Sequence, residues 1–76
     1  MGHAREEKLL HILGAVEAAG EAGAARDSLE TWIQRSLRAS GQATYVYLKD
    51  MRVRRWVREG ASRRYTLTVD GRKELA

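Results

Sequence analysis

The spacing of apolar residues changes along this chain of 76 residues, and that change constrains the fold more than any other feature. In the first half, apolar side chains recur every three or four residues, which is the repeat of an amphipathic helix. After Trp56, apolar residues flank a glycine-containing turn and alternate with polar ones at Tyr65 and Leu67, which is typical of a β-hairpin. A chain of this length forms one domain with one small core. We therefore expect a single α+β domain over residues 1–76.

The first forty residues predict two helices. An apolar stripe runs from Ala4 to about Ala19, and Gly20 can stop that helix at its C-terminal end. Residues 20–25 read as a short loop. A second helix begins where Asp27 or Ser28 can cap the free N–H groups, and it should end near Ala39. Glu30 lies three residues after Asp27, as in a capping box. The apolar face of the second helix is formed by Leu29, Trp32, Ile33 and Leu37.

The segment from Ala43 to Lys49 supports two interpretations. Its aromatic and β-branched residues favour a strand by propensity alone. However, Thr44, Leu48 and Met51 would share one helical face, and Ser40 can cap a helix that starts just after it. We favour a helix over residues 41–54 with these three side chains pointing inward.

The remaining residues predict a hairpin and a short helix. The first strand covers Trp56–Arg58, the turn Glu59–Ser62, and the second strand Arg63–Val69. Thr68 can then cap a final helix, Val69–Leu75. Trp32 and Trp56 lie in apolar patterns, so we expect both to pack in the core.

The C-terminal pattern resembles the wing of MarR-like and PadR-like winged helix transcriptional regulators. The matching residues are Trp56-Val57-Arg58-Glu59-Gly60, Arg63-Arg64-Tyr65-Thr66-Leu67-Thr68, Gly71-Arg72 and Leu75. The resemblance implies a winged helix-turn-helix fold: three helices, a two-stranded β-hairpin wing and a short C-terminal helix. Two departures are visible. Arg55 stands where the family usually has a glycine before the apolar pair, and Ala43-Thr44 replaces a Thr-Val pair.

The positive charge is concentrated in the second half of the chain. Residues 1–40 contain five basic and six acidic side chains, whereas residues 41–76 contain nine basic and four acidic ones. Six arginines fall within residues 52–64. Arginine suits bidentate contacts with phosphate and guanine, so this half is expected to face a polyanion.

The resemblance implies that the third helix enters the DNA major groove and that the wing contacts the backbone or the minor groove. Gln42 would then face adenine and Val46 a thymine methyl group, while Lys49 and Arg52 would bind phosphate. The complete candidate set is Gln42, Tyr45, Val46, Lys49, Arg52, Arg58, Arg63 and Arg64. Two alternatives stay open: Tyr45 could pack against the second helix, and an Arg-rich hairpin could keep an exposed sheet edge soluble.

The sequence predicts a regulator that binds double-stranded DNA, and no enzyme. It holds no nucleophile with a matching base, no phosphate-binding glycine loop and no cofactor signature. His3 and His11 lack partners at ligand spacing, so no metal is expected. No apolar run approaches the length of a membrane span. The absence of cysteine suits the cytoplasm, where a DNA-binding protein would associate with the nucleoid.

Three further expectations concern partners. A winged helix can instead serve as a protein-interaction module in a larger assembly. An RNA or single-strand binder would stack bases on Tyr45, Tyr47 or Tyr65. A homodimer is also expected, because helix-turn-helix proteins often bind DNA as dimers. Leu10 and Ile12 are the surplus apolar residues that would form its interface.

Overall fold

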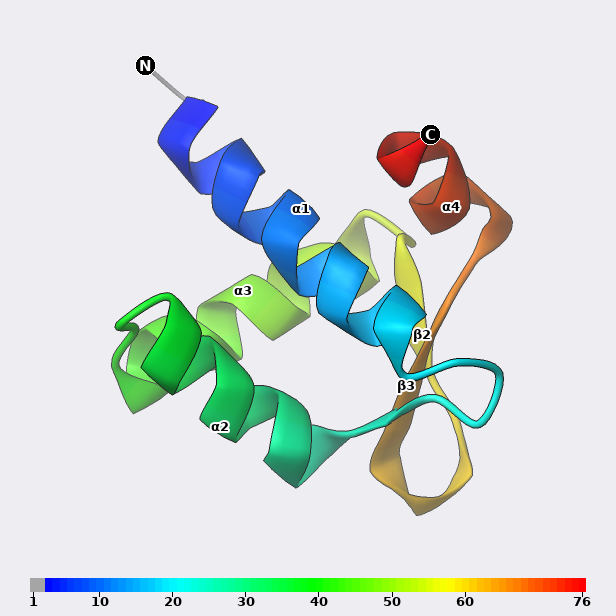
Figure 1. Ribbon diagram of the computed structural model, residues 1–76, viewed down its shortest axis with the longest axis horizontal. Coiled ribbons are helices and arrows are strands. Elements are labelled where there is room, and N and C mark those ends of the chain that lie inside the picture. The colour runs from blue at the N-terminus through cyan, green and yellow to red at the C-terminus, as the bar shows by residue number, and fades with distance from the viewer. Residues whose placement is uncertain (1–2) are drawn as a thin grey trace.

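A computed structural model describes residues 3–76, with side chains from Arg5 onward (Figure 1). These residues form a small α+β fold with four α-helices and a three-stranded antiparallel sheet. The elements are α1 (His3–Ala18), β1 (Ala24–Ala25), α2 (Arg26–Ser36), α3 (Gly41–Val53), β2 (Val57–Glu59), β3 (Arg64–Leu67) and α4 (Val69–Leu75). A short 3₁₀ turn, Ala61–Arg63, joins β2 to β3.

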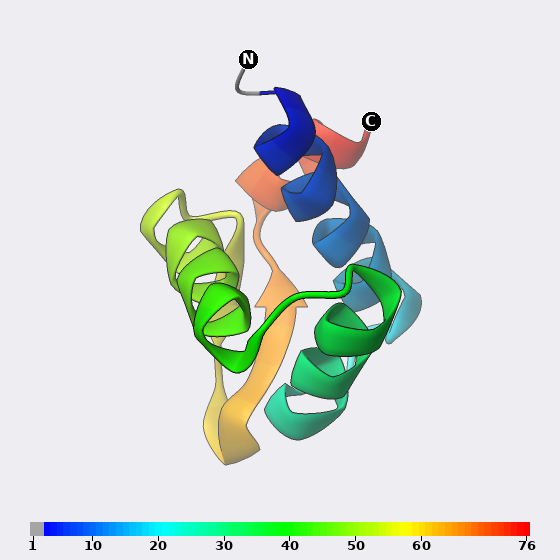
Figure 2. The ribbon, with the colours of Figure 1, turned by 90° about the vertical axis from the view of Figure 1, so that its left-hand side faces the viewer.

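The sheet has the order β1-β3-β2, so β3 is its central strand. Tyr65 in β3 lies opposite Ala24 of β1 and Glu59 of β2. The core lies between the sheet and the helices, and Figure 2 shows α1, α2 and α3 grouped around it. Its buried apolar side chains are Leu9, Ile12, Leu13, Val16, Ala24, Leu29, Ile33, Leu48, Met51, Trp56, Val57 and Tyr65. Trp56 is therefore a core residue as predicted, and Trp32 packs against the core from α2.

The sheet has one strand more than the predicted two-stranded hairpin. Residues 20–25 were expected to form only a loop, yet Ala24 and Ala25 pair with Tyr65 and Arg64 as a third strand. Two alanines carry no strand pattern of their own, so only the pairing with β3 makes this strand. Gly23 precedes it with a φ of +86°, and a Cβ there would approach the Tyr65 carbonyl oxygen to 2.9 Å. Glycine is therefore required for β1 to reach β3.

The predicted ends of α2 were also wrong. Ala25 is its N-cap residue, and no side chain caps it, so neither Asp27 nor Ser28 does so. The helix begins directly after β1, so its N-cap lies two or three residues earlier than the capping pattern suggested. Glu30 accepts a hydrogen bond from Arg26 rather than closing a capping box. The helix stops at Ser36, short of Ala39, because Arg38 adopts a left-handed φ of +52°.

The helical interpretation of residues 41–54 is confirmed, and so is its inward face. The Ser40 hydroxyl oxygen accepts a hydrogen bond from the Ala43 amide at 3.0 Å. Thr44, Leu48 and Met51 are at most 1% exposed. The buried Thr44 hydroxyl donates to the Ser40 carbonyl, which satisfies its polar group inside the core.

The corner between α3 and β2 has the hydrogen bonds of a Schellman motif. The Arg55 amide donates to the Arg52 carbonyl, and the Trp56 amide donates to the Met51 carbonyl, both at 3.0 Å. Arg55 itself has a φ of +60°, the left-handed conformation that glycine usually supplies at this position. The backbone at this corner therefore has the conformation that glycine usually supplies, although the residue is an arginine.

Arg55→Gly is expected to stabilise the protein. Glycine removes a left-handed cost of roughly 1–2 kcal/mol but adds roughly 0.4–1 kcal/mol of unfolded-chain entropy, which leaves a gain of about 0.5–1 kcal/mol. Thermal unfolding should show a Tm increase of roughly 2–8 °C. Arg55→Ala is the matched control, because it removes the same side chain and keeps the strain. A Tm for Arg55→Gly no higher than that of Arg55→Ala would contradict this explanation.

The N-terminal end of α4 is hydrogen-bonded to the same corner. The Thr68 hydroxyl accepts from the Gly71 amide at 3.0 Å, which confirms the predicted cap, and it donates to the Arg55 carbonyl. The Thr68 amide donates to the Trp56 carbonyl at 3.0 Å. Gly71 is buried, and a Cβ built on it would lie 2.0 Å from the Trp56 carbonyl oxygen. No side chain fits between α4 and β2 at this point.

Gly71→Ala should therefore destabilise the fold by about 2 kcal/mol or more, because α4 must move away from Trp56. Urea unfolding measures the change. Gly41→Ala is the control, since a Cβ there meets nothing within 4 Å. It should leave stability unchanged or raise it slightly. Equal stability of the two variants would show that α4 yields without cost.

Candidate nucleic-acid interface

The outward face of α3 carries the residues that the sequence assigned to the DNA groove. Tyr45 is 49% exposed and Val46 39%, and Gln42 and Lys49 are also exposed. Tyr45 thus keeps half its surface open to solvent. This face is exposed because α3 uses its opposite face for the core. Figure 2 shows α3 beside the hairpin, with the start of the helix toward the same end of the molecule as the β2–β3 turn.

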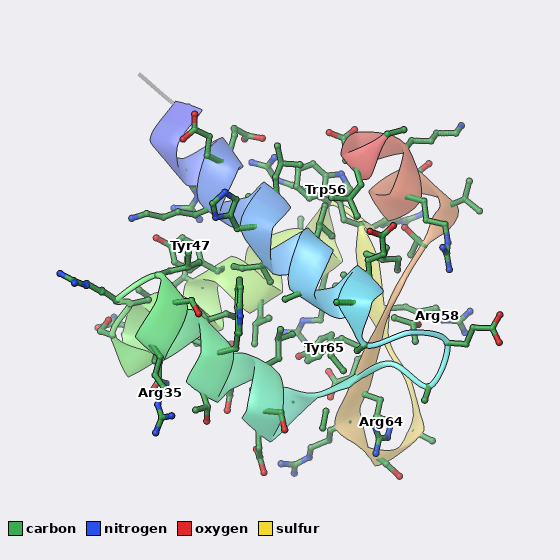
Figure 3. The ribbon with its side chains drawn as sticks, viewed as in Figure 1. Arg35, Tyr47, Trp56, Arg58, Arg64 and Tyr65 are labelled. Atoms are coloured by element: carbon green, nitrogen blue, oxygen red, sulfur yellow. The ribbon has the colours of Figure 1, made fainter. Side chains whose placement is uncertain are left out.

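The β2–β3 hairpin extends beyond the helices and exposes its three candidate arginines. Its turn lies one residue later than predicted: Gly60 donates to the Arg64 carbonyl at 2.8 Å, and β3 starts at Arg64. Arg63 stands at the tip with a φ of +54°. Arg64 directly precedes Tyr65 in β3, and Arg58 lies opposite Thr66, which directly follows Tyr65. Because Tyr65 points into the core and neighbouring residues of a strand point to opposite faces, Arg58 and Arg64 leave the sheet on its outer face. Figure 3 shows Arg58 and Arg64 away from the ring of Tyr65, and Arg64 also donates to the Gly23 carbonyl at 3.3 Å.

Four other arginines, Arg5, Arg26, Arg52 and Arg54, are paired with carboxylates. Arg5 and Arg54 both bind Asp50, with nitrogen–oxygen distances of 3.2 and 3.0 Å. Arg54 also reaches Glu6 at 2.9 Å, so a chain of four alternating charges ties α1 to the end of α3. The Arg54 guanidinium carbon lies 4.9 Å from the centre of the Trp56 ring. These contacts hold Arg54 at the corner between α3 and β2.

Burial acts to raise the pKa of the Asp50 carboxyl, but hydrogen bonds from Arg54 and Arg5 outweigh it, so the net pKa is lowered. The pKa of Arg54 is raised by its hydrogen bonds to Asp50 and Glu6. Both shifts favour the charged forms and keep this network intact at neutral pH.

Arg52 and Arg26 are paired as well. Arg52 lies 3.4 Å from Glu59 of the hairpin, and Arg26 lies 3.2 Å from Glu30 on its own helix. Among the residues with described side chains, the ion pairs involve only these arginines, together with Arg5 and Arg54. None of them involves the following candidates: Lys49, Arg58, Arg63 and Arg64. Sequence alone could not separate the two groups, because the carboxylate partners lie up to 48 residues away.

The three tyrosines differ in what they can contact. Tyr65 is fully buried, so its ring has no open face for a base. Tyr47 packs against the core, and the Arg5 guanidinium lies 5.7 Å from its ring centre. Only Tyr45 presents substantial aromatic surface among the residues described. Single-strand stacking on several tyrosines, as the sequence allowed, would therefore require a rearranged core.

Ile12 cannot form a dimer interface, because it is completely buried in the core. Leu10 is half-buried and packs against the core. The predicted homodimer surface is thus wrong for Ile12, and Leu10 offers only part of its side chain to a partner. The large apolar side chains that are exposed in the described part of the chain are Tyr45, Val46, Val53 and Val69.

Within the residues with described side chains, no group of three or more histidines and carboxylates is placed to hold a metal ion. The side chain of His3 lies outside them. No helix among residues 3–76 is both long and apolar enough to cross a membrane. Comparisons of the chain with protein-family models, with curated proteins and with solved structures found no match.

The lowered pKa of Asp50 predicts a specific loss of stability in acid. A carboxyl whose pKa is lower in the folded state stabilises the protein above its unfolded-state value of about 3.9, and this contribution disappears as pH falls through the folded value. Asp50→Asn removes the contribution at every pH. The difference in unfolding free energy between parent and Asp50→Asn, measured by urea at several pH values, should therefore shrink below about pH 4. A difference that is independent of pH would contradict the network.

Proposed function

We propose that this protein binds double-stranded DNA as a winged helix-turn-helix domain and acts as a transcriptional regulator. The observation that carries the proposal is the pairing pattern of the cations. Four arginines, Arg5, Arg26, Arg52 and Arg54, are bound to carboxylates. Lys49 on α3 and the hairpin arginines are in no ion pair, and neither are Lys8, Arg35, Arg38, Arg55, Arg72 and Lys73 elsewhere in the described residues. A duplex could use these cations without breaking a salt bridge.

The outward face of α3 has the chemistry of a reading helix. An α-helix fits the major groove, where Gln42 could accept and donate to adenine and Val46 could contact a thymine methyl group. Lys49, one turn further on, would bind phosphate. This assignment uses the exposed positions and leaves Thr44, Leu48 and Met51 to the core.

The hairpin would act as the wing. Its arginines project from the tip and the outer face of a short ribbon, a shape that can follow the backbone or enter a narrow minor groove, whose negative potential attracts arginine. The third strand supports this role, because β1 fixes the central strand of the hairpin to the helices.

Selection of binding sites from a random duplex pool tests the proposal directly. We expect an enriched sequence, and an affinity for the selected duplex that falls steeply with salt. Four phosphate contacts correspond to a slope of about −3 to −4 in a plot of log affinity against log salt concentration. Enrichment only from single-stranded DNA or RNA pools, or no binding at low salt, would contradict duplex recognition.

Arg63→Ala/Arg64→Ala should weaken binding to the selected duplex and reduce the salt slope by about 2. Arg72→Ala/Lys73→Ala removes the same charge from α4, which Figure 1 shows at the other end of the molecule from the hairpin turn. This control should leave the slope close to that of the parent. Equal effects of the two double variants would mean that only net charge matters, which excludes a specific wing.

A further inference from the structure

Arg52 lies on the reading helix but is turned toward the hairpin. Its Nη1 is 3.4 Å from Oε1 of Glu59, and its side chain is only 36% exposed. Its Nε is buried and has no acceptor among the described residues. The sequence assigned this guanidinium to phosphate, but in the structure it contacts a carboxylate of the wing.

Glu59 faces α3 because of the strand register. It lies directly opposite Tyr65, and residues paired across an antiparallel ladder share a face of the sheet. Tyr65 points into the core, so Glu59 also leaves the sheet on the helix side. Its neighbour Arg58 leaves on the outer face. The wing thus directs a carboxylate at the helix and a cation away from it.

The Arg52–Glu59 pair lies beside the buried side chain of Tyr65. Tyr65 is 0% exposed, and its hydroxyl is buried without a hydrogen-bond partner among the described residues. The pKa of Tyr65 is raised by burial and by the charge of Glu59, while the charges of Arg26 and Arg52 oppose the rise. Elements α3, β2 and β3 meet at this point, because Arg52 contacts Glu59 and Glu59 lies opposite Tyr65.

The negative charge of Glu59 does not by itself strengthen binding to DNA. It is an acidic residue between Arg58 and the tip of a basic hairpin, and it would repel a phosphate backbone. Any benefit to binding must be geometric and must act through Arg52.

We infer that Arg52 and Glu59 are positioning residues: their ion pair sets the angle of the wing to α3, so that both elements reach one duplex. This inference rests on the proposed DNA binding. It removes Arg52 from the phosphate contacts and makes an acidic residue necessary for binding a polyanion.

Glu59→Gln separates this role from simple charge effects. The variant makes the protein more positive, yet its affinity for the selected duplex should fall by roughly threefold to tenfold, because the wing loses its fixed angle. Glu74→Gln on α4 makes the same change in charge away from the hairpin. Its affinity should stay the same or rise slightly. Thermal melts confirm that each variant is folded.

A double-mutant cycle tests the coupling. Arg52→Gln should weaken binding without lowering the salt slope, and Arg52→Gln/Glu59→Gln should bind no more weakly than the worse single variant. The charge swap Arg52→Glu/Glu59→Arg should recover part of the affinity that Arg52→Glu alone loses.

The opposite results overturn the inference. If Arg52 contacts phosphate, Arg52→Gln lowers the salt slope by about 1, and Glu59→Gln binds more tightly than the parent because it releases the arginine. With a parent protein that binds duplex, either result contradicts only the positioning role. A parent that fails to bind duplex at low salt contradicts the proposed function, and the inference with it.

Discussion

The backbone at Arg55 and Trp56 is the junction on which the rest of this structure depends. The amides of these two residues donate to carbonyls of the last turn of α3 and end that helix. The Trp56 carbonyl accepts a hydrogen bond from the Thr68 amide, and the buried Gly71 packs against the same carbonyl. The Trp56 side chain is in the core. Helix α3, the sheet and helix α4 are therefore oriented by two consecutive peptide groups. The left-handed arginine at this junction costs stability, but the hydrogen bonds around it leave the chain no other path.

Much of the fold could be predicted where a local signal agrees with the tertiary structure. The Ser40 and Thr68 caps and the inward face of α3 are examples, since each depends on residues within one or two helical turns. The α3 segment is instructive because strand propensity favoured the wrong answer. The burial of Thr44, Leu48 and Met51 decided it, since packing of a continuous face outweighs the weak preference of individual residues.

Features created by distant partners were not predictable. The strand β1 exists only because β3 lies beside it, and that pairing in turn moves the start of α2 to Arg26. The candidate site shows the same limit. Exposure of Gln42, Tyr45, Val46 and Lys49 followed from helical periodicity, whereas the engagement of Arg52 by Glu59 depends on the register of a hairpin. Of the six arginines in residues 52–64, Arg52 and Arg54 are thus paired with carboxylates, and the other four are in no ion pair within the part of the chain that the structure describes.

The placement of β3 between β1 and β2 also bears on how the hairpin moves. Its backbone has hydrogen-bonding neighbours along both edges, while β2 has one only on its inner edge and the turn at Ala61–Arg63 has little support. Local opening begins where the ladder is thinnest. Amide hydrogens of β3 should therefore exchange with solvent more slowly than those of β2, and those of the turn fastest. The hairpin would flex by bending its outer strand and tip around a central strand that stays fixed to the helices.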